Sequence, residues 1–536
     1  MLRSLLALPL LLLAPLAHAQ TLPPEQAAIK AHVQFLASDA MRGREAGTRD
    51  FDIAAEYVAA QFLAAGLKPG GEKGGWFQPV SLVTYRSAEK GTMSLTHGKT
   101  RIPMLFGTDF VSSPAPASPD LTVSGNVVFA GYGIVYPEGK RDDYKGLDVR
   151  GRIVAILPGV PKGLPADVTA HLSDDDQKAH IAELRGARGV VVLESAANHE
   201  QYPFEAIVPY WDYPRTTWAG PDGKAHATAP GAPIVAYLGW AGAEKLFAGS
   251  RIKWADVLAA ERKGGRIPTG ALMVTLETTT KTRLRTTPSH NVVGILEGSD
   301  PALKGEYVVL SAHLDHVGVG EPVGGDRIYN GAMDNAVGTA SILQVARMFQ
   351  ASGKRPRRSL IFLSLTAEEK GLIGSDYFAT LPTVPKSALV ADINLDMPIL
   401  TYPLQDVVVL GGERSSIGPV VAAVAAGEGL KVVPDPAPEE MFFVRSDHYS
   451  FVQAGIPAVS IDTGPGGEGA AAQKKFLAEN YHKPSDQIDL PFNWDSAAKF
   501  VRINYGVART LADADARPRW NKGDFFGVLF DGYGAK

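Results

Sequence analysis

The chain has 536 residues, a formal net charge of −4 and 45% hydrophobic residues, and it contains no cysteine. This length and apolar content predict large buried cores and more than one domain. The lack of cysteine excludes disulfide bonds, thiolate catalysis and cysteine metal sites, and the negative charge argues against a nucleic-acid partner.

The first residues have the pattern of a cleavable signal peptide. Arg3 precedes an apolar run from Leu5 to Leu16, and Ala17-His18-Ala19 offers a small-residue cleavage site. The run is too short to span a bilayer comfortably, and no cysteine follows it for lipid attachment. We therefore expect residues 1–19 to be a signal peptide. The mature protein is expected in the periplasm or outside the cell, without a membrane anchor.

The next part of the chain predicts two helices and then a change of character. Residues 28–37 and 51–65 show helical periodicity, and residues 113–119 are rich in Pro, Ala and Ser, which predicts a linker. From about Leu121 to Thr280, short apolar runs lie among long loops rich in Gly, Pro and Asp: 127–129, 153–156 and 190–193. These runs predict strands, so we expect a β-rich domain inserted into the main fold.

Beyond about residue 291, strands alternate with helices. Ile342, Val345, Ala346 and Phe349 recur at helical spacing, and three short apolar runs read as buried strands: 307–310, 360–363 and 389–393. This alternation predicts an α/β fold with a mostly parallel central sheet flanked by helices. Ligands of such sheets gather at the carboxyl ends of the strands. The aromatic tail at 519–526 is expected to pack on the surface.

Polar side chains follow these strands in a suggestive order. The candidates are His313, Asp315, Asp334, Glu368, Glu369, Asp396 and His482. Imidazole and carboxylate ligands without a thiolate favour a zinc-type hydrolytic centre, and a spare glutamate can act as a general base. Each residue alone could instead be a buried, hydrogen-bonded structural group. His316 and His290 also lie near the strands, and for both we expect packing rather than ligation.

The motifs together resemble peptidase family M28, whose members include secreted bacterial zinc aminopeptidases. They are His313-x-Asp315, Gly331-x-x-Asp334, Glu368-Glu369-x-Gly371, Asn394-x-Asp396 and Tyr481-His482-x-Pro484-x-Asp486. The likeness covers roughly residues 286–515. The insertion resembles a protease-associated domain, through stretches such as 129–134, 143–151 and 186–190. We expect residues 20–117 to begin the peptidase domain, 118–285 to form the insertion, 286–515 to hold the catalytic part and 516–536 to form a tail.

The resemblance implies two Zn²⁺ ions per chain and a role for each candidate. Asp334 would bridge the ions, with His313 and Asp396 on one and Glu369 and His482 on the other. Glu368 would be the general base. Two further roles are implied, namely orientation of His313 by Asp315 and contact of His448 with substrate or the tetrahedral intermediate. A structural role for His448 is left open.

The implied activity is that of an exported aminopeptidase acting on peptides, with three alternatives. A carboxypeptidase would need an arginine cluster for the terminal carboxylate, and Arg445 alone does not provide one. A glutaminyl cyclase can work with one zinc, whereas this chain has every position of the two-metal set. A receptor-like binding protein would lack metal ligands. We expect the insertion to overhang the site and limit substrate size.

Overall fold

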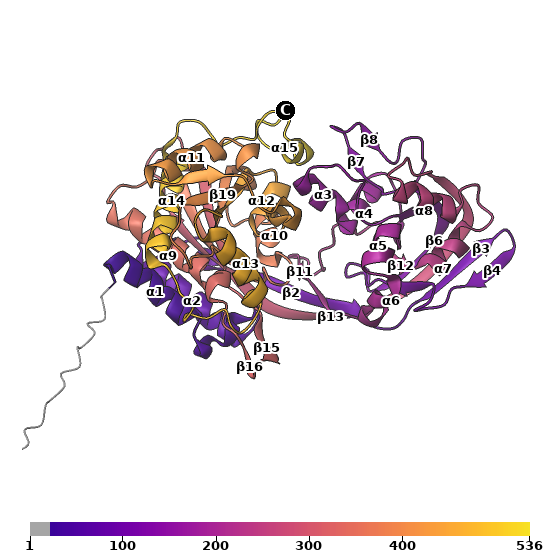
Figure 1. The fold of residues 1–536 in the computed structure, drawn as a ribbon, viewed down its shortest axis with the longest axis horizontal. Helices are drawn as coiled ribbons and strands as arrows, with labels where there is room; N and C mark the ends of the chain where they lie inside the picture. Colours follow the sequence, from indigo (N-terminus) through magenta and orange to yellow (C-terminus); the bar gives the residue numbers. More distant parts are fainter. Residues whose placement is uncertain (1–21) are drawn as a thin grey trace, which may run out of the picture.

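The computed structural model describes residues 22–536, which form two lobes (Figure 1). The expected signal peptide, residues 1–19, lies outside the described residues. Within residues 22–536, no helix is long and apolar enough to cross a membrane. The larger lobe contains the N-terminal helices and the C-terminal half of the chain, and the smaller lobe is built mainly from the middle of the chain.

The larger lobe is built on a mixed sheet whose centre is parallel. Four neighbouring strands, in the order β17, β14, β18 and β21, run parallel to one another. Antiparallel partners flank them on both sides. The bounds, in spatial order, are β11 (Arg215–Ala219), β2 (Phe77–Ser87), β13 (Gly270–Leu296), β17 (Ser359–Leu365), β14 (Tyr307–His313), β18 (Leu389–Asn394), β21 (Ala458–Thr463), β19 (Asp406–Leu410) and β20 (Lys431–Val433). The short β1 (Lys68–Pro69) also pairs with β13.

Helices cover both faces of this sheet. One face is packed by α1 (Pro24–Leu36), α2 (Arg49–Ala64), α9 (Val337–Ala351), α11 (Ile417–Gly427) and α14 (Trp494–Asp513). The other face is packed by α10 (Ile373–Thr380), α12 (His448–Gln453) and α15 (Phe525–Leu529). The central strands are buried on both sides, which explains their continuous apolar sequences. The predicted strands at 307–310, 360–363 and 389–393 and the predicted helices at 28–37, 51–65 and 342–349 are confirmed.

The smaller lobe has its own sheet, which shares β13 with the larger lobe. Its strands are β4 (Thr100–Pro103), β3 (Thr92–His97), the first half of β13, β6 (Asp120–Phe129), β9 (Ile153–Ile156), β10 (Gly189–Leu193), β12 (Ile234–Leu238) and β5 (Phe110–Ser112). Helices pack beside it: α3 (Ala166–Ser173), α4 (Asp175–Leu184), α5 (Ala196–Gln201), α6 (Phe204–Ile207), α7 (Trp240–Phe247) and α8 (Trp254–Arg262). The insertion therefore combines strands with helices.

The connection between the lobes is a long strand rather than a flexible linker. β13 pairs with β3 and β6 up to Lys281, and from Thr282 onward it pairs with β2. The predicted linker at 113–119 is wrong, because it joins β5 and β6 of the same sheet. The boundaries at 117 and 285 stay predictions. From the strand pairing, we propose an insertion that begins near Ala88, after β2 leaves β13.

The C-terminal tail is an integral part of the core. Trp520 and Phe526 are buried, and Phe526 packs near Phe443 and Tyr449 of the larger lobe. His171 of α3, in the smaller lobe, packs against Phe526 and contacts the hydroxyl of Tyr449. The expectation that the aromatic tail merely packs on the surface is therefore wrong, since its rings lie at the junction of the two lobes. The tail sequence has no helical or strand periodicity, so it did not indicate that these side chains are buried.

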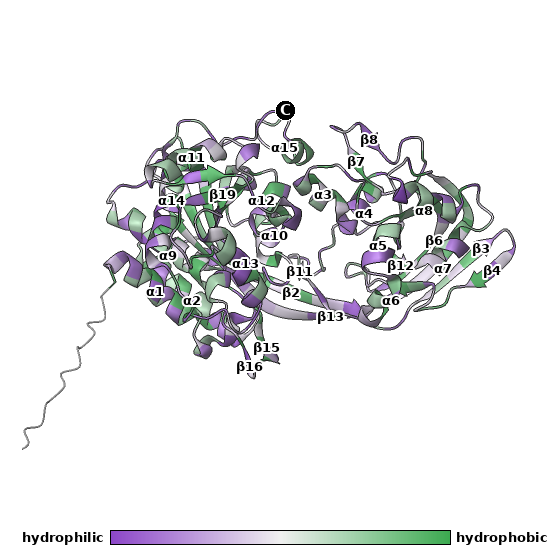
Figure 2. Ribbon diagram, viewed as in Figure 1, coloured by the Kyte–Doolittle hydropathy of each residue, from purple (hydrophilic) through white to green (hydrophobic). Residues whose placement is uncertain are grey.

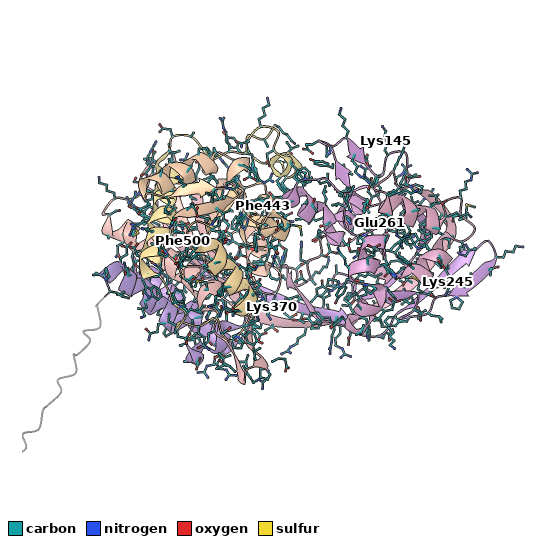
Figure 3. All side chains as sticks on the ribbon, in the orientation of Figure 1. Lys145, Lys245, Glu261, Lys370, Phe443 and Phe500 are labelled. Atoms are coloured by element: carbon teal, nitrogen blue, oxygen red, sulfur yellow. The ribbon has the colours of Figure 1, made fainter. Side chains whose placement is uncertain are left out.

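The distribution of hydropathy follows this architecture. Hydrophobic segments lie in the interior of both lobes, and hydrophilic ones lie mainly on outer helices and loops (Figure 2). Phe500 of α14 is fully buried in the larger lobe, as is Phe443 near the junction (Figure 3). Each lobe has a buried hydrophobic cluster of its own, and a further cluster continues from one lobe into the other. The polar candidate site lies in the larger lobe.

Candidate active site

The candidate residues come together at the carboxyl edge of the central strands. His313 is the last residue of β14, Glu368 and Glu369 follow β17, and Asp396 follows β18. The other two candidates are Asp334, which lies in the turn before α9, and His482, which lies after α13 (Gly469–Glu479). Because parallel strands end at the same edge, residues separated by long stretches of sequence become neighbours there.

Asp334 lies between two groups of ligand-type atoms. Its Oδ1 is 3.2 Å from Nε2 of His313, which in turn lies 2.9 Å from Oδ1 of Asp396. Its Oδ2 is 3.2 Å from Nε2 of His482, which lies 3.0 Å from Oε2 of Glu369. The two oxygens of one carboxylate thus face two separate clusters. This is the arrangement expected of a carboxylate that bridges two metal ions.

The carboxylates of the site create an environment that stabilises positive charge. Burial alone would lower the pKa of His482, but hydrogen bonds to Asp334 and Glu369 raise it to about 10. Burial would likewise lower the pKa of His313, yet Asp396 and Glu368 hold it well above its ordinary value. The carboxylates therefore stabilise positive charge on both imidazoles. A metal ion can supply that charge in place of the protons, because ligands bind metals in their deprotonated forms.

Glu368 has the environment expected of a general base. Its side chain lies beside the cluster, with Oε2 3.9 Å from Nε2 of His313, and it borders the main cavity. Burial raises its pKa well above the ordinary value, although His313 opposes the shift. A raised carboxyl pKa brings the group closer to the range in which it can both accept and return a proton.

The contacts of Asp315 differ from the role that the family resemblance implies. His313 Nδ1 lies 3.1 Å from the backbone carbonyl oxygen of Asp315, not from its carboxylate. The carboxylate instead accepts a hydrogen bond of 3.1 Å from the backbone N–H of Glu368. Because Asp315 is only two residues after His313, its backbone carbonyl, rather than its side chain, lies next to the imidazole. Asp315 thereby fixes both His313 and the loop that carries Glu368.

Two further supporting residues were given no role by sequence reasoning. Ser446 donates a hydrogen bond of 2.5 Å to Oδ2 of Asp396 and accepts one of 2.6 Å from the amide of Asn394. Asp486 accepts hydrogen bonds from the backbone N–H groups of Met333 and Asp334. Asp486 belongs to the motif that contains His482, and Ser446 to the stretch that contains His448. Their positions within these motifs are the only sequence feature that could have indicated a supporting role.

The positions of the other histidines relative to the cluster differ in part from the expectation. His448 is fully buried against Phe443, does not border the cavity and is not brought to the cluster. His290 packs against Phe51 and Phe77, as expected. His316, for which packing was also expected, instead places Nδ1 2.6 Å from Oε1 of Glu369.

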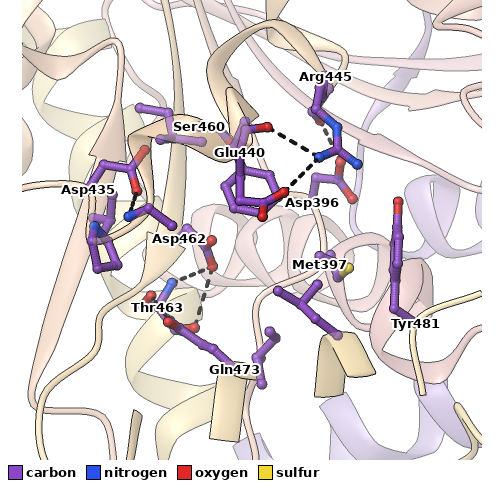
Figure 4. A pocket seen from close by; sticks show the side chains of 18 of the residues that line it. Asp396, Met397, Asp435, Glu440, Arg445, Ser460, Asp462, Thr463, Gln473 and Tyr481 are labelled. Atoms are coloured by element: carbon purple, nitrogen blue, oxygen red, sulfur yellow. Dashed lines mark hydrogen bonds and ion pairs between the residues drawn. The ribbon is translucent and has the colours of Figure 1, made fainter. Parts of the chain in front are cut away.

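A cavity of about 710 Å³ opens beside the cluster (Figure 4). Asp334, Glu368, Asp396 and His482 border it, and its lining residues all lie between positions 334 and 482. Apolar side chains make part of the wall, namely Met397, Ile399, Val408, Leu410, Phe442 and Leu477. No lining residue belongs to the smaller lobe, although α3 of that lobe contacts the segments at 438–440 and 442–444 that carry part of the lining. The overhang of the site by the insertion stays a prediction. Helix α13 forms one side.

Comparison with known proteins identifies the part of the chain that carries this site. Residues 291–508 match the model of peptidase family M28. The chain carries a peptidase family M28 domain. All seven candidates from His313 to His482 lie in this M28 domain.

Curated relatives match this chain only in part. Leupeptin-inactivating enzyme 1 of Streptomyces exfoliatus is 27% identical over 48% of this chain and 53% of its own length. A probable glutamate carboxypeptidase of Arthroderma benhamiae is 28% identical over 43% of this chain and 31% of its own length. The chain thus spans about half or less of the length of these relatives. A solved aminopeptidase from Aneurinibacillus sp. strain AM-1 is 21% identical, with coverage of 92% and 95% and a TM-score of 0.46.

Proposed function

We propose that this protein is an exported zinc-dependent aminopeptidase that removes amino-terminal residues from peptides. The observation that carries the proposal is the position of Asp334, with one carboxylate oxygen toward His313 and Asp396 and the other toward His482 and Glu369. Export rests on the signal-like sequence before residue 20.

The residues present fit a pair of zinc ions. The donors are imidazole nitrogens and carboxylate oxygens, which suit zinc, and the carboxylates create a demand for positive charge. His313, Asp334 and Asp396 would hold one ion, and Asp334, Glu369 and His482 the other. Ions bound there would polarise the scissile carbonyl and lower the pKa of a water molecule.

Glu368 carries the proton through the reaction. Its carboxylate borders the cavity next to the cluster, so it can take a proton from the attacking water. It then returns the proton to the departing amine as the peptide bond breaks. Ser446 and Asp315 keep Asp396 and the Glu368 loop in place during these transfers.

The charge of the cavity supports an aminopeptidase over a carboxypeptidase. Beyond the metal cluster, the lining carries the carboxyl groups of Asp435, Glu439, Glu440 and Asp462, and only two cationic side chains, Arg445 and Lys474. Burial raises the pKa of Asp462 to about 7, so the negative charge near neutral pH comes mainly from the other three. Arg445 lies 3.8 Å from Glu440 and donates to its backbone carbonyl (Figure 4). An acidic lining attracts a substrate ammonium group, whereas a terminal carboxylate needs an unpaired cation. Carboxypeptidase activity is the second candidate, because one of the relatives is named as a probable glutamate carboxypeptidase.

The other two alternatives have less support. A single-zinc cyclase needs only one of the two ligand groups, and both groups are complete on either side of Asp334. A receptor-like protein would need neither ligands nor a base, yet Glu368 borders the cavity beside them.

A matched peptide panel tests the proposal. Each peptide would be offered with a free amino terminus, with an acetylated one, and with an amidated carboxyl terminus. An aminopeptidase cleaves the free and the amidated forms and leaves the acetylated form intact. Cleavage of acetylated peptides that is blocked by carboxyl amidation would instead establish a carboxypeptidase.

A further inference from the structure

His316 lies inside the metal cluster although it is outside the ligand set proposed above. Its ring is buried, with Nδ1 2.6 Å from Oε1 of Glu369 and 3.9 Å from Oδ2 of Asp334. On the other side of the same carboxylates, Nε2 of His482 lies 3.0 Å from Oε2 of Glu369 and 3.2 Å from Oδ2 of Asp334. Glu369 and Asp334 therefore stand between two imidazoles.

The contact between His316 and Glu369 is short but poorly aligned for a hydrogen bond. Both ring nitrogens of His316 and Oε1 of Glu369 are buried without a hydrogen-bond partner, although Nδ1 and Oε1 are close together. Burying unpaired polar atoms is unfavourable, so each such atom in a folded protein calls for an explanation. Ligand-type atoms of His316, Asp334 and Glu369 all lie within 4.8 Å of one another, so these three side chains form a group that could hold a cation.

The backbone leaves room for the ring at this place. Gly331 has a left-handed conformation, with φ of +60°, and a Cβ atom built on it would lie 2.5 Å from Cγ of His316. That distance is too short for any non-hydrogen contact. Gly331 begins the turn that carries Asp334, so the same turn delivers the carboxylate and accommodates the imidazole.

We propose that Nδ1 of His316 is a fourth protein ligand of the zinc ion held by Asp334, Glu369 and His482. This inference rests on the zinc centre proposed above. The position then has two imidazoles and two carboxylates, whereas the other position has only His313 with Asp334 and Asp396. Imidazole favours zinc over hard oxygen-seeking cations, so the two positions are unequal. The position that includes His316 binds zinc more tightly and fills first.

Zinc affinity, rather than activity, is the direct test. Apoprotein would be titrated with zinc against a chromophoric chelator, comparing wild type with His316→Ala. Losing even an outer partner of a metal ligand costs 10–100-fold in affinity, so loss of a ligand should weaken the tighter of two binding steps by about 100-fold or more. The weaker step should change little. His290→Ala is the matched control, because His290 packs on aromatic rings away from the cluster and should leave both steps unchanged.

A second variant separates ligation from simple orientation of Glu369. His316→Asn keeps an N–H donor near the position of Nδ1 but replaces the imidazole ligand. Ligation predicts that Asn fails like Ala, whereas rescue of wild-type affinity by Asn would overturn the proposal and make His316 a positioning residue. X-ray absorption at the zinc edge should show one imidazole more in wild type than in His316→Ala. Equal imidazole counts would also overturn it.

These results separate this inference from the proposed function. If wild type binds two zinc ions and cleaves free amino termini while His316→Ala has unchanged zinc affinity, only the role of His316 is wrong. If wild-type apoprotein binds no zinc, both proposals are overturned.

Discussion

Asp486 holds the main chain of Asp334 from 152 positions away. Its Oδ2 accepts a hydrogen bond of 3.0 Å from the backbone N–H of Asp334, and its carboxylate also accepts from Met333 at 2.9 Å. Asp486 is fully buried and lies four residues after His482. One segment of the chain therefore supplies a candidate ligand and also fixes the turn that carries Asp334, the proposed bridging residue.

Asp486→Ala should weaken metal binding without removing a ligand. Outer partners of metal ligands typically contribute 10–100-fold in affinity, so we expect a loss of that order in zinc titrations. Asp486→Asn keeps one acceptor oxygen and should recover part of the loss. Wild-type affinity in the Ala variant would show that the turn of Asp334 is held by other contacts.

Glu368→Gln should leave the metal content unchanged and remove the base. Loss of a general base typically lowers the rate by about 10²–10⁴, here in kcat. Asp334→Ala is the contrasting variant, since it should lose metal together with activity. Metal analysis and steady-state kinetics on the two purified variants make the comparison. Near-normal turnover by the Gln variant would contradict the assignment of Glu368.

Ser446→Ala should disturb the site through Asp396. The hydroxyl donates to Asp396 and is itself held by Asn394, so its removal leaves one ligand oxygen without its partner. We expect metal affinity to fall by about 10–100-fold. Ser450→Ala is a matched control, because Ser450 is also buried but bonds to Ser375 rather than to the site. Equal effects of the two changes on metal affinity would indicate general destabilisation.

Arg44 is expected to be a strong determinant of stability. Its buried guanidinium donates to the backbone carbonyls of Leu314, Asn330 and Gly331, and burial lowers its pKa to only about 10, so it stays charged at neutral pH. Arg44→Met should lower the free energy of unfolding by about 3 kcal/mol or more, because it leaves these buried carbonyl groups without a donor at a cost of about 1–3 kcal/mol each. Urea unfolding measures this.

The matched control for Arg44 is its neighbour Arg42. The side chain of Arg42 is 58% exposed and makes a single ion pair of 3.4 Å with Asp50. Exposed ion pairs contribute about 0–1 kcal/mol, so Arg42→Met should change the stability by no more than that. A loss for Arg44→Met no larger than for Arg42→Met would contradict the structural role of Arg44.

The parallel core of the fold was predictable because its signal is local. Buried strands such as β14 and β17 are continuous apolar runs, and the ligand-type residues at their ends follow directly in sequence. The family resemblance then gave each candidate a role. The position of the cluster at one edge of the sheet followed from the parallel topology alone.

Contacts between distant segments were not predictable. The hydrogen bond from Ser446 to Asp396 and the docking of Phe526 near Tyr449 depend on how loops pack, which no periodicity records. The linker at 113–119 failed because proline and alanine mark any irregular segment, including one inside a sheet. His316 was missed because packing is the commonest role of a buried histidine, and only three-dimensional proximity to Glu369 indicates another.

Zinc titration of the apoprotein tests the account most directly. Chelated protein would receive zinc in small increments while hydrolysis of a peptide with a free amino terminus is followed at each step. We predict no activity without metal and a maximum at about two equivalents per chain, the number of ions that a bridging carboxylate at Asp334 can hold. Full activity at one equivalent, with no second ion bound, would contradict it.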